Sequence, residues 1–138
     1  MTEPKTIAGT LAADDRFSLM AGACRATGLD VVLAGKGPLT VCAPTNQAFL
    51  KLSPREFSVL VQDICGVLPR VLQYHILSGR LPAAALGERV SCPTLLDIPA
   101  SLSKKDGRVF VCNAPVLLPD ICCSNGMLHG IGTVLLPL

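Results

Sequence analysis

The stretch that decides the fold is TVCAPTNQAF, which runs from Thr40 to Phe49. A short apolar run, Leu39 to Ala43, has the composition of a β-strand and is stopped by Pro44. Thr45 can cap a helix that starts directly afterwards, because a threonine side chain accepts a hydrogen bond from a free backbone amide at a helix start. The stretch therefore predicts a strand that leads straight into a short helix ending near Phe49.

A second informative stretch, NGMLHGIGTVLLP, covers Asn125 to Pro137. The Asn125-Gly126 pair favours a turn, since both residue types tolerate a positive φ. The apolar run that follows predicts a last strand from Met127 to Leu136. Between the two stretches lies the pair Tyr74-His75, in a segment, Tyr74 to Leu77, that we expect to be extended.

The remaining pattern is helical first and extended later. Asp14 or Asp15 can cap a helix that ends near Gly28, and Ser53 with Glu56 three residues later forms a capping box. The second half has short apolar runs broken by Pro, Gly, Asn and Asp, with a hairpin signal at Asp106-Gly107. Helices followed by strands favour an α+β fold over a series of βαβ units.

Composition limits the function. The 138 residues fit one domain, 1–138, which can bury a sizeable core: half of them are apolar and the mean hydropathy is +0.52. The net charge is only +2, and the one basic cluster, Lys104-Lys105 with Arg108, surrounds a turn. Because nucleic-acid binding needs a basic stripe, often with stacking aromatic residues, we do not expect a nucleic-acid partner.

No stretch has the pattern of a transmembrane helix. The longest uncharged run, 121–138, contains three glycines and Pro137, which suits a turn and a strand. The N-terminus, MTEPKTIAGT, lacks the apolar centre of a signal peptide. This predicts either that export information is missing from this chain or that the protein stays in the cell.

Seven cysteines leave at least one thiol unpaired within the chain. Cys122-Cys123 with His129 suggest a thiol-dependent redox or metal-binding role, which is the alternative function. Against it, adjacent residues of a strand point to opposite faces, and the chain has only two histidines. No metal or cofactor is expected. The sequence also lacks paired carboxylates, a nucleophile elbow and a phosphate-binding loop, so we do not expect an enzyme.

In this order and at this spacing, the two stretches and Tyr74-His75 between them resemble the signature of the fasciclin-like domain, an adhesion module. The resemblance covers 6–137. Two positions depart from the family pattern: Cys42 stands where an aromatic residue is usual, and Gly132 where an aspartate is often found. The resemblance implies a wedge-shaped β-sandwich with helices packed along one side.

The resemblance also implies a non-enzymatic role: binding a surface or extracellular-matrix protein, a glycan or a second copy of the domain, outside the cell, at its surface or in the periplasm. The partner-binding residues that it implies are Asp120, Ile121, Tyr74 and His75. An aspartate can complete the coordination of a receptor-held cation, and a neighbouring isoleucine can fill a pocket. The alternative stays open that Asp120 is an ordinary loop residue and that the other three, like His129, serve the core.

Overall fold

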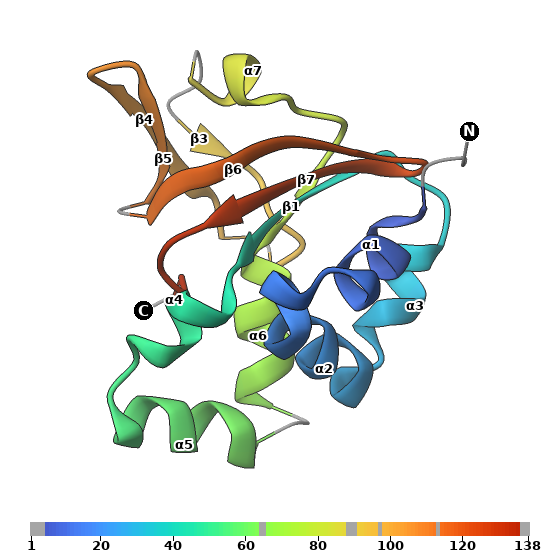
Figure 1. Cartoon of the computed structure of the whole chain (residues 1–138), viewed down its shortest axis with the longest axis vertical. Helices are drawn as coiled ribbons and strands as arrows, with labels where there is room; N and C mark the ends of the chain where they lie inside the picture. The colour runs from blue at the N-terminus through green and yellow to red at the C-terminus, as the bar shows by residue number, and fades with distance from the viewer. Residues whose placement is uncertain (1–4, 64–65, 88–90, 97, 113, 136–138) are drawn as a thin grey trace.

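The computed structural model describes residues 5–63, 66–87, 91–96, 98–112 and 114–135 (Figure 1). Helices and strands share the chain, and most helices come first. The helices are α1 (Ile7–Ala13), the 3-10 turn η1 (Asp15–Phe17), α2 (Ser18–Thr27), α3 (Leu29–Ala34), α4 (Asn46–Leu50), α5 (Pro54–Gln62), α6 (Val67–Tyr74) and α7 (Ala83–Gly87). The strands are β1 (Leu39–Pro44), β2 (Ile76–Ser78), β3 (Ser91–Cys92), β4 (Ala100–Lys105), β5 (Arg108–Val111), β6 (Ala114–Cys123) and β7 (Gly126–Ile131).

The strands form one sheet in the order β2-β1-β7-β6-β5-β4-β3. β1 and β7, the second and third strands in this order, pair in parallel, and the other pairs are antiparallel. An isolated bridge between Leu77 of β2 and Thr94, just after β3, nearly closes the sheet on itself. Helices α1 to α6 lie on one side of the central strands and α7 lies on the other (Figure 1). The expected α+β class, with helices packed along one side of a curved sheet, is confirmed.

Two apolar clusters fill this arrangement. The first lies between the helices and the central strands and includes Phe17, Met20, Leu33 and Leu128. The second lies within the curve of the sheet, under α7, and includes Leu86, Leu102 and Ile131. No helix among the described residues has the length and apolar character needed to cross a bilayer.

Three of the predicted helix-end signals are present, but the predicted cap of α2 by Asp14 or Asp15 is wrong: Asp14 caps the 3-10 turn η1, and α2 follows Phe17 without a side-chain cap. Thr45 Oγ1 accepts a hydrogen bond from the amide of Ala48 at the start of α4 (3.3 Å). Ser53 and Glu56 form both bonds of the capping box at the start of α5. Gly28 ends α2 in the left-handed conformation, at φ 79°. These features can be predicted from the sequence because each one involves only the backbone groups at the end of its own helix, which lack partners within the helix.

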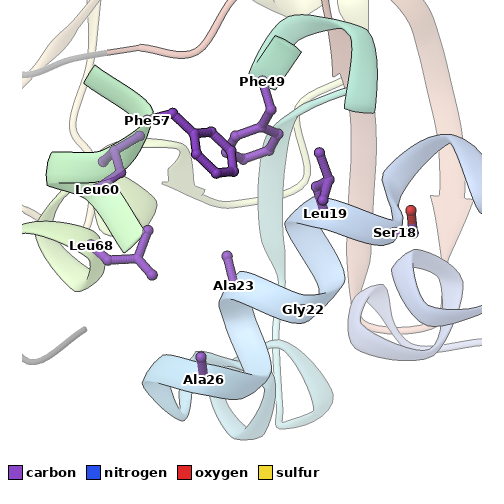
Figure 2. Close-up of a pocket in the computed structure, with 9 residues that line it drawn as sticks. All are labelled: Ser18, Leu19, Gly22, Ala23, Ala26, Phe49, Phe57, Leu60 and Leu68. Carbon is purple, nitrogen blue, oxygen red and sulfur yellow. The ribbon is translucent and has the colours of Figure 1, made fainter. Parts of the chain in front are cut away.

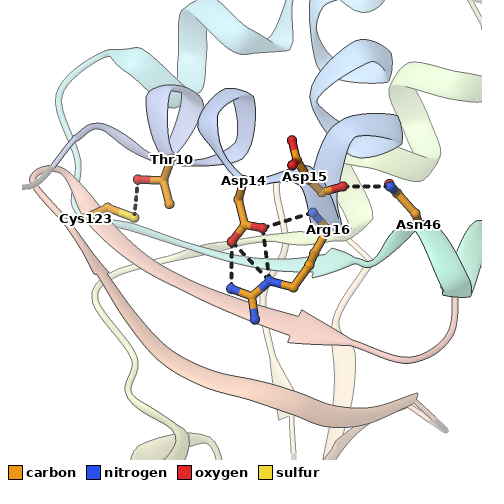
Figure 3. A network of polar contacts seen from close by, with 6 residues as sticks. All are labelled: Thr10, Asp14, Asp15, Arg16, Asn46 and Cys123. Atoms are coloured by element: carbon orange, nitrogen blue, oxygen red, sulfur yellow. Dashed lines mark hydrogen bonds and ion pairs between the residues drawn. The ribbon is translucent and has the colours of Figure 1, made fainter.

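Asn46 joins the first helices to α4. Its Oδ1 accepts from the amide of Leu19 (2.9 Å), and its Nδ2 donates to the carbonyl of Asp15 and to the hydroxyl of Ser18 (2.8 Å each). Figure 3 shows the contact with Asp15, beside the surface ion pair of Asp14 with Arg16. Asn46 therefore holds α2 against the strand-to-helix stretch that opens the sequence.

The second stretch differs from its prediction. The turn consists of Ser124 and Asn125, and Gly126 is already the first residue of β7, which ends at Ile131 instead of Leu136. Neither Asn125 nor Gly126 has a positive φ. Glycine is needed at 126 because a Cβ there would lie 1.8 Å from the carbonyl oxygen of Leu39 on the parallel strand. Close approach of two strands, and not turn conformation, is the physical reason for this glycine.

Asn125 ties three segments together. Its Oδ1 accepts from the amide of Ile7 at the start of α1 (2.9 Å), and its Nδ2 donates to the carbonyls of Leu33 and Gly35 at the end of α3 (2.7 and 2.9 Å). Its own carbonyl accepts from the amide of Leu39 (3.1 Å). The asparagine of this motif thus fixes the start of the chain's first helix to the last hairpin.

Candidate functional site

Asp120 lies in a bulge of β6. The pairing with β7 is regular from Cys123–Gly126 to Ile121–Leu128, but the next pair is Leu118 with Gly130. Pro119 and Asp120 therefore face the single residue His129, which is the arrangement of a β-bulge. Asp120 is exposed and adopts φ 58°, in the left-handed region that residues other than glycine seldom enter.

His129 replaces the missing strand contact. The backbone amide of Asp120 donates to Nδ1 of His129 (3.0 Å), and the Nε2 of the same ring lies 2.7 Å from the carbonyl oxygen of Leu81. Since an amide only donates and a carbonyl only accepts, the ring is neutral, with its proton on Nε2. Burial lowers the pKa of His129, and this outweighs the bond to Leu81 and the nearby charge of Asp120, which both raise it.

The carboxylate of Asp120 is anchored from the other side of the bulge. Its Oδ1 accepts a hydrogen bond from the amide of Ala83, the first residue of α7 (2.8 Å). In the part of the chain that the structure describes, no hydrogen bond reaches the second oxygen, Oδ2. The site therefore presents one solvent-facing carboxylate oxygen from a side chain whose direction is fixed at both the backbone and the carboxyl end.

Ile121, the next residue, turns the other way. It is half-buried, lies opposite Leu128 of β7 and packs against the first apolar cluster. Only part of its side chain is therefore available at the surface.

Tyr74 and His75 are buried, with 8% and 1% of their surfaces exposed. The expectation that both lie in an extended segment is wrong: Tyr74 is the last residue of α6, His75 is its C-cap, and the strand begins at Ile76. The residues of α6 that face inward are Leu68, Val71, Leu72 and Tyr74. Helical spacing, with positions three and four residues apart on one face, carries this buried face on to His75.

The hydrogen bonds of this pair are all internal. His75 Nδ1 lies 2.7 Å from the carbonyl oxygen of Val71, and its Nε2 accepts from the amide of Leu135 (2.9 Å), so this ring is also neutral. Burial lowers the pKa of His75 to about 4. The hydroxyl of Tyr74 lies 3.4 Å from both the carbonyl oxygen of Pro99 and the Sγ of Cys112, and burial raises the pKa of Tyr74 to about 12.

The predicted site residues thus separate into two places. Asp120 is hydrogen-bonded to His129 and Ala83, whereas Tyr74 and His75 bond to α6, to Pro99 and to Leu135. The contact between Asp120 and His129 can be predicted from the sequence, because antiparallel pairing that starts at Cys123–Gly126 brings position 120 opposite position 129. The contact with Ala83 carries no comparable signal, because it joins positions 37 residues apart.

The cysteines offer no observation in favour of the thiol-dependent alternative. Cys122 is exposed, but Cys123 points inward, with its Sγ 3.5 Å from the hydroxyl of Thr10 (Figure 3). Burial raises the pKa of Cys123, which disfavours the reactive thiolate. Within the described residues, no three His, Cys, Asp or Glu side chains could hold a metal ion. Cys65 lies outside the described residues.

A separate groove of about 290 Å³ lies between α2 and the helices α4 to α6. Small residues of α2, among them Gly22 and Ala23, form one wall, and Phe49 and Phe57 stand on the other (Figure 2). The single hydroxyl in its lining, that of Ser18, is already bonded to Asn46. The lining contains no charged group and so supplies neither an acid, a base nor a nucleophile.

This fold and these motifs define a family. The sequence profile of the Fasciclin domain matches residues 15–137, and the chain belongs to this family. It is 39% identical over 123 residues to Uncharacterized protein sll1735 of Synechocystis sp., covering 89% of this chain and 91% of that protein. It is 35% identical over 132 residues to the Transforming growth factor-beta-induced protein ig-h3 of Sus scrofa, covering 96% of this chain but only 19% of that protein.

The solved structures agree on the fold. A FAS1 domain pair from the insect cell adhesion molecule Fasciclin I superimposes with a TM-score of 0.84 at 21% identity. The match covers 96% of this chain and 51% of the domain pair.

Proposed function

We propose that this chain acts as one fasciclin domain, without enzymatic activity, that binds a protein or glycan partner through the Asp120 bulge. The observation that carries the proposal is the exposed carboxylate of Asp120, whose direction is fixed by His129 and Ala83 while Oδ2 stays open to solvent. A carboxylate held in place loses little conformational entropy on binding, which favours a specific contact. Membership of the family, and the likeness to an insect cell adhesion molecule, support the same role.

The other predicted residues have different parts in this proposal. Ile121 contributes the exposed portion of its half-buried side chain. Tyr74 and His75 have a structural role in this proposal, because their side chains connect the end of α6 to Pro99 and Leu135. Both are buried, so they do not contact a partner in the folded domain. The proposed partner is a surface or matrix protein, a glycan or a second copy of the domain. The proposed location is the cell surface, the extracellular space or the periplasm.

The test is a pull-down from surface and envelope extract of the source cells with immobilised protein. Asp120→Asn is the informative variant, because asparagine tolerates the left-handed conformation and keeps an oxygen for the amide of Ala83, yet carries no charge. Asp15→Ala removes another exposed acid and is the matched control.

The proposal expects a partner that wild type and Asp15→Ala retain and Asp120→Asn loses, with Ile121→Val weakened to a smaller extent. Equal retention of the partner by all four proteins would show that the Asp120 bulge is not the binding site. Recovery of no partner would overturn the interaction role itself.

A further inference from the structure

We propose that His129 is the positioning residue for Asp120, and that uptake of a proton by its imidazole releases both Asp120 and the start of α7. The contact site would then weaken in acid. The weaker binding in acid rests on the proposed function. The release of Asp120 and α7 does not, because it can be measured on the isolated chain.

The starting point is a closed ring of hydrogen bonds. His129 bonds to the carbonyl of Leu81 and to the amide of Asp120, and the Asp120 carboxylate bonds back to the amide of Ala83, two residues after Leu81. The three bonds join β7 to the segment before α7, β6 to β7, and β6 to the first residue of α7. Loss of one bond therefore loosens all three segments at this point.

The bond from Asp120 to His129 is the weak point of the ring. Asp120 is displaced from regular pairing, so its amide is satisfied by a side chain instead of a β7 carbonyl. Its left-handed backbone, at φ 58°, is less unfavourable for aspartate than for most residues but is still seldom adopted, so the contacts of the bulge favour it. The lone pair on Nδ1 of His129 accepts the hydrogen bond that keeps the Asp120 backbone in this conformation.

A proton on Nδ1 removes the lone pair. The ring then presents an N–H group toward the N–H group of Asp120, and an attractive contact becomes a repulsive one. The imidazolium also attracts the carboxylate of Asp120, which draws it away from the amide of Ala83. Both effects act in the same direction, since they free the bulge from its left-handed conformation and α7 from its anchor.

Among the residues that the structure describes, few ionisable groups face His129. On β6 it is Asp120, and on β1 it is Cys42, its pairing partner, which stays neutral because burial raises its pKa to about 12. Arg80, which precedes Leu81, points its guanidinium at the carbonyls of Cys123 and Ser124. The stretch from Ala83 to Gly87 that forms α7 has no ionisable side chain. Asp120 is thus the charged group that responds directly.

The test is ¹H–¹⁵N NMR of the full chain between pH 8 and pH 3.5, with the His129 ring followed in the same samples. The expected result is that the amides of Asp120 and Ala83 shift with the midpoint of the His129 ring. Below that midpoint, the Asp120 amide should lose about tenfold of its protection from hydrogen exchange, the effect of one hydrogen bond. The amide of Leu135, which bonds to His75, is the internal control and should follow the His75 ring.

His129→Gln is the matched variant, since its amide group can accept from Asp120 and donate to Leu81 but does not titrate. In this variant the amides of Asp120 and Ala83 should show no step at the midpoint measured for the His129 ring of the wild type. If the Asp120 amide fails to follow the His129 ring in the wild type, the inference is wrong, whether or not the variant folds. A step retained in folded His129→Gln would overturn it as well.

The NMR titration needs no partner, so its failure is separate from failure of the proposed function. Where the pull-down recovers a partner, the further expectation is that the wild type releases it across the same pH range. His129→Gln should retain it there. Equal release by both proteins would show that His129 does not control the contact.

Discussion

Lowering the pH from 7 to 4 should destabilise the fold through one buried side chain, His75. Its ring is 1% exposed and neutral, with one nitrogen bonded to Val71 and the other accepting from Leu135. A second proton would place an N–H group against the amide of Leu135, in a buried site. The perturbation that isolates this group is His75→Gln, which can make similar bonds but cannot titrate.

The magnitude follows from two pKa values. Burial lowers the pKa of His75 from 6.5 to about 4, and an unfolded chain has the ordinary value. Between these values the unfolded state binds the proton and the folded state does not, so stability falls as the pH falls through this window. Above pH 6.5 the contribution is complete; near pH 4 about 3 kcal/mol has been lost. Small domains are stable by about 5–15 kcal/mol, so this loss is a large fraction of the total.

The assay is urea unfolding of wild type and His75→Gln at intervals from pH 7.5 to pH 4. Carboxylates and His129 titrate in both proteins, so the difference between the two free energies of unfolding isolates His75. That difference should change by about 3 kcal/mol in favour of the variant as the pH falls, with a slope near 1.4 kcal/mol per pH unit in the middle of the range. A difference that stays constant to within about 0.5 kcal/mol would refute the reasoning, since measured effects below that size are ordinary surface variation.

The remaining predictions concern single contacts. Gly126→Ala should cost at least about 3 kcal/mol in urea unfolding, because its Cβ would meet a β1 carbonyl at 1.8 Å. Gly22→Ala, on the exposed groove wall, should instead gain about 0.5–1 kcal/mol, because no heavy atom lies within 4 Å of the added carbon and alanine favours a helix; a loss there would contradict this. Tyr74→Phe should cost about 1 kcal/mol for its buried hydroxyl, and an unchanged stability would show that the hydroxyl bonds are not formed. In native protein, iodoacetamide should label Cys122 well before Cys123, as mass spectrometry of timed samples can show; equal rates would contradict the inward orientation of Cys123.

The sequence predicted those elements whose signals are local. Thr45 and Ser53 mark helix starts because a side chain three residues or fewer from a free amide can satisfy it, whatever the rest of the fold does. The hairpin at Asp106-Gly107 is recognisable for a similar reason: both residues have the positive φ that the turn requires. Each of these features is complete within about four residues of chain.

The features that the sequence did not yield depend on distant parts of the chain. The sequence predicts an extended segment from Tyr74 to Leu77, whereas α6 runs to Tyr74 and its inward face extends through His75. The close approach that requires Gly126 comes from Leu39, and the anchor of Asp120 comes from Ala83. The bulge itself was not predicted, although Pro119, which has no amide to donate, stands at the point where pairing with β7 changes register.

The parallel pairing of β1 with β7 has a consequence during synthesis. Leu39 and Gly126 are partners in this pairing, yet they are 87 positions apart. A ribosome adding about 5–20 residues per second takes roughly 4–17 s to travel that distance. Throughout this time β1 lacks its parallel partner, and the apolar face beneath α1 to α6 lacks the part of its cover that β7 supplies. The nascent chain is therefore expected to depend on chaperones until β7 has emerged, and mutations that slow its docking should reduce yield even where they leave equilibrium stability unchanged.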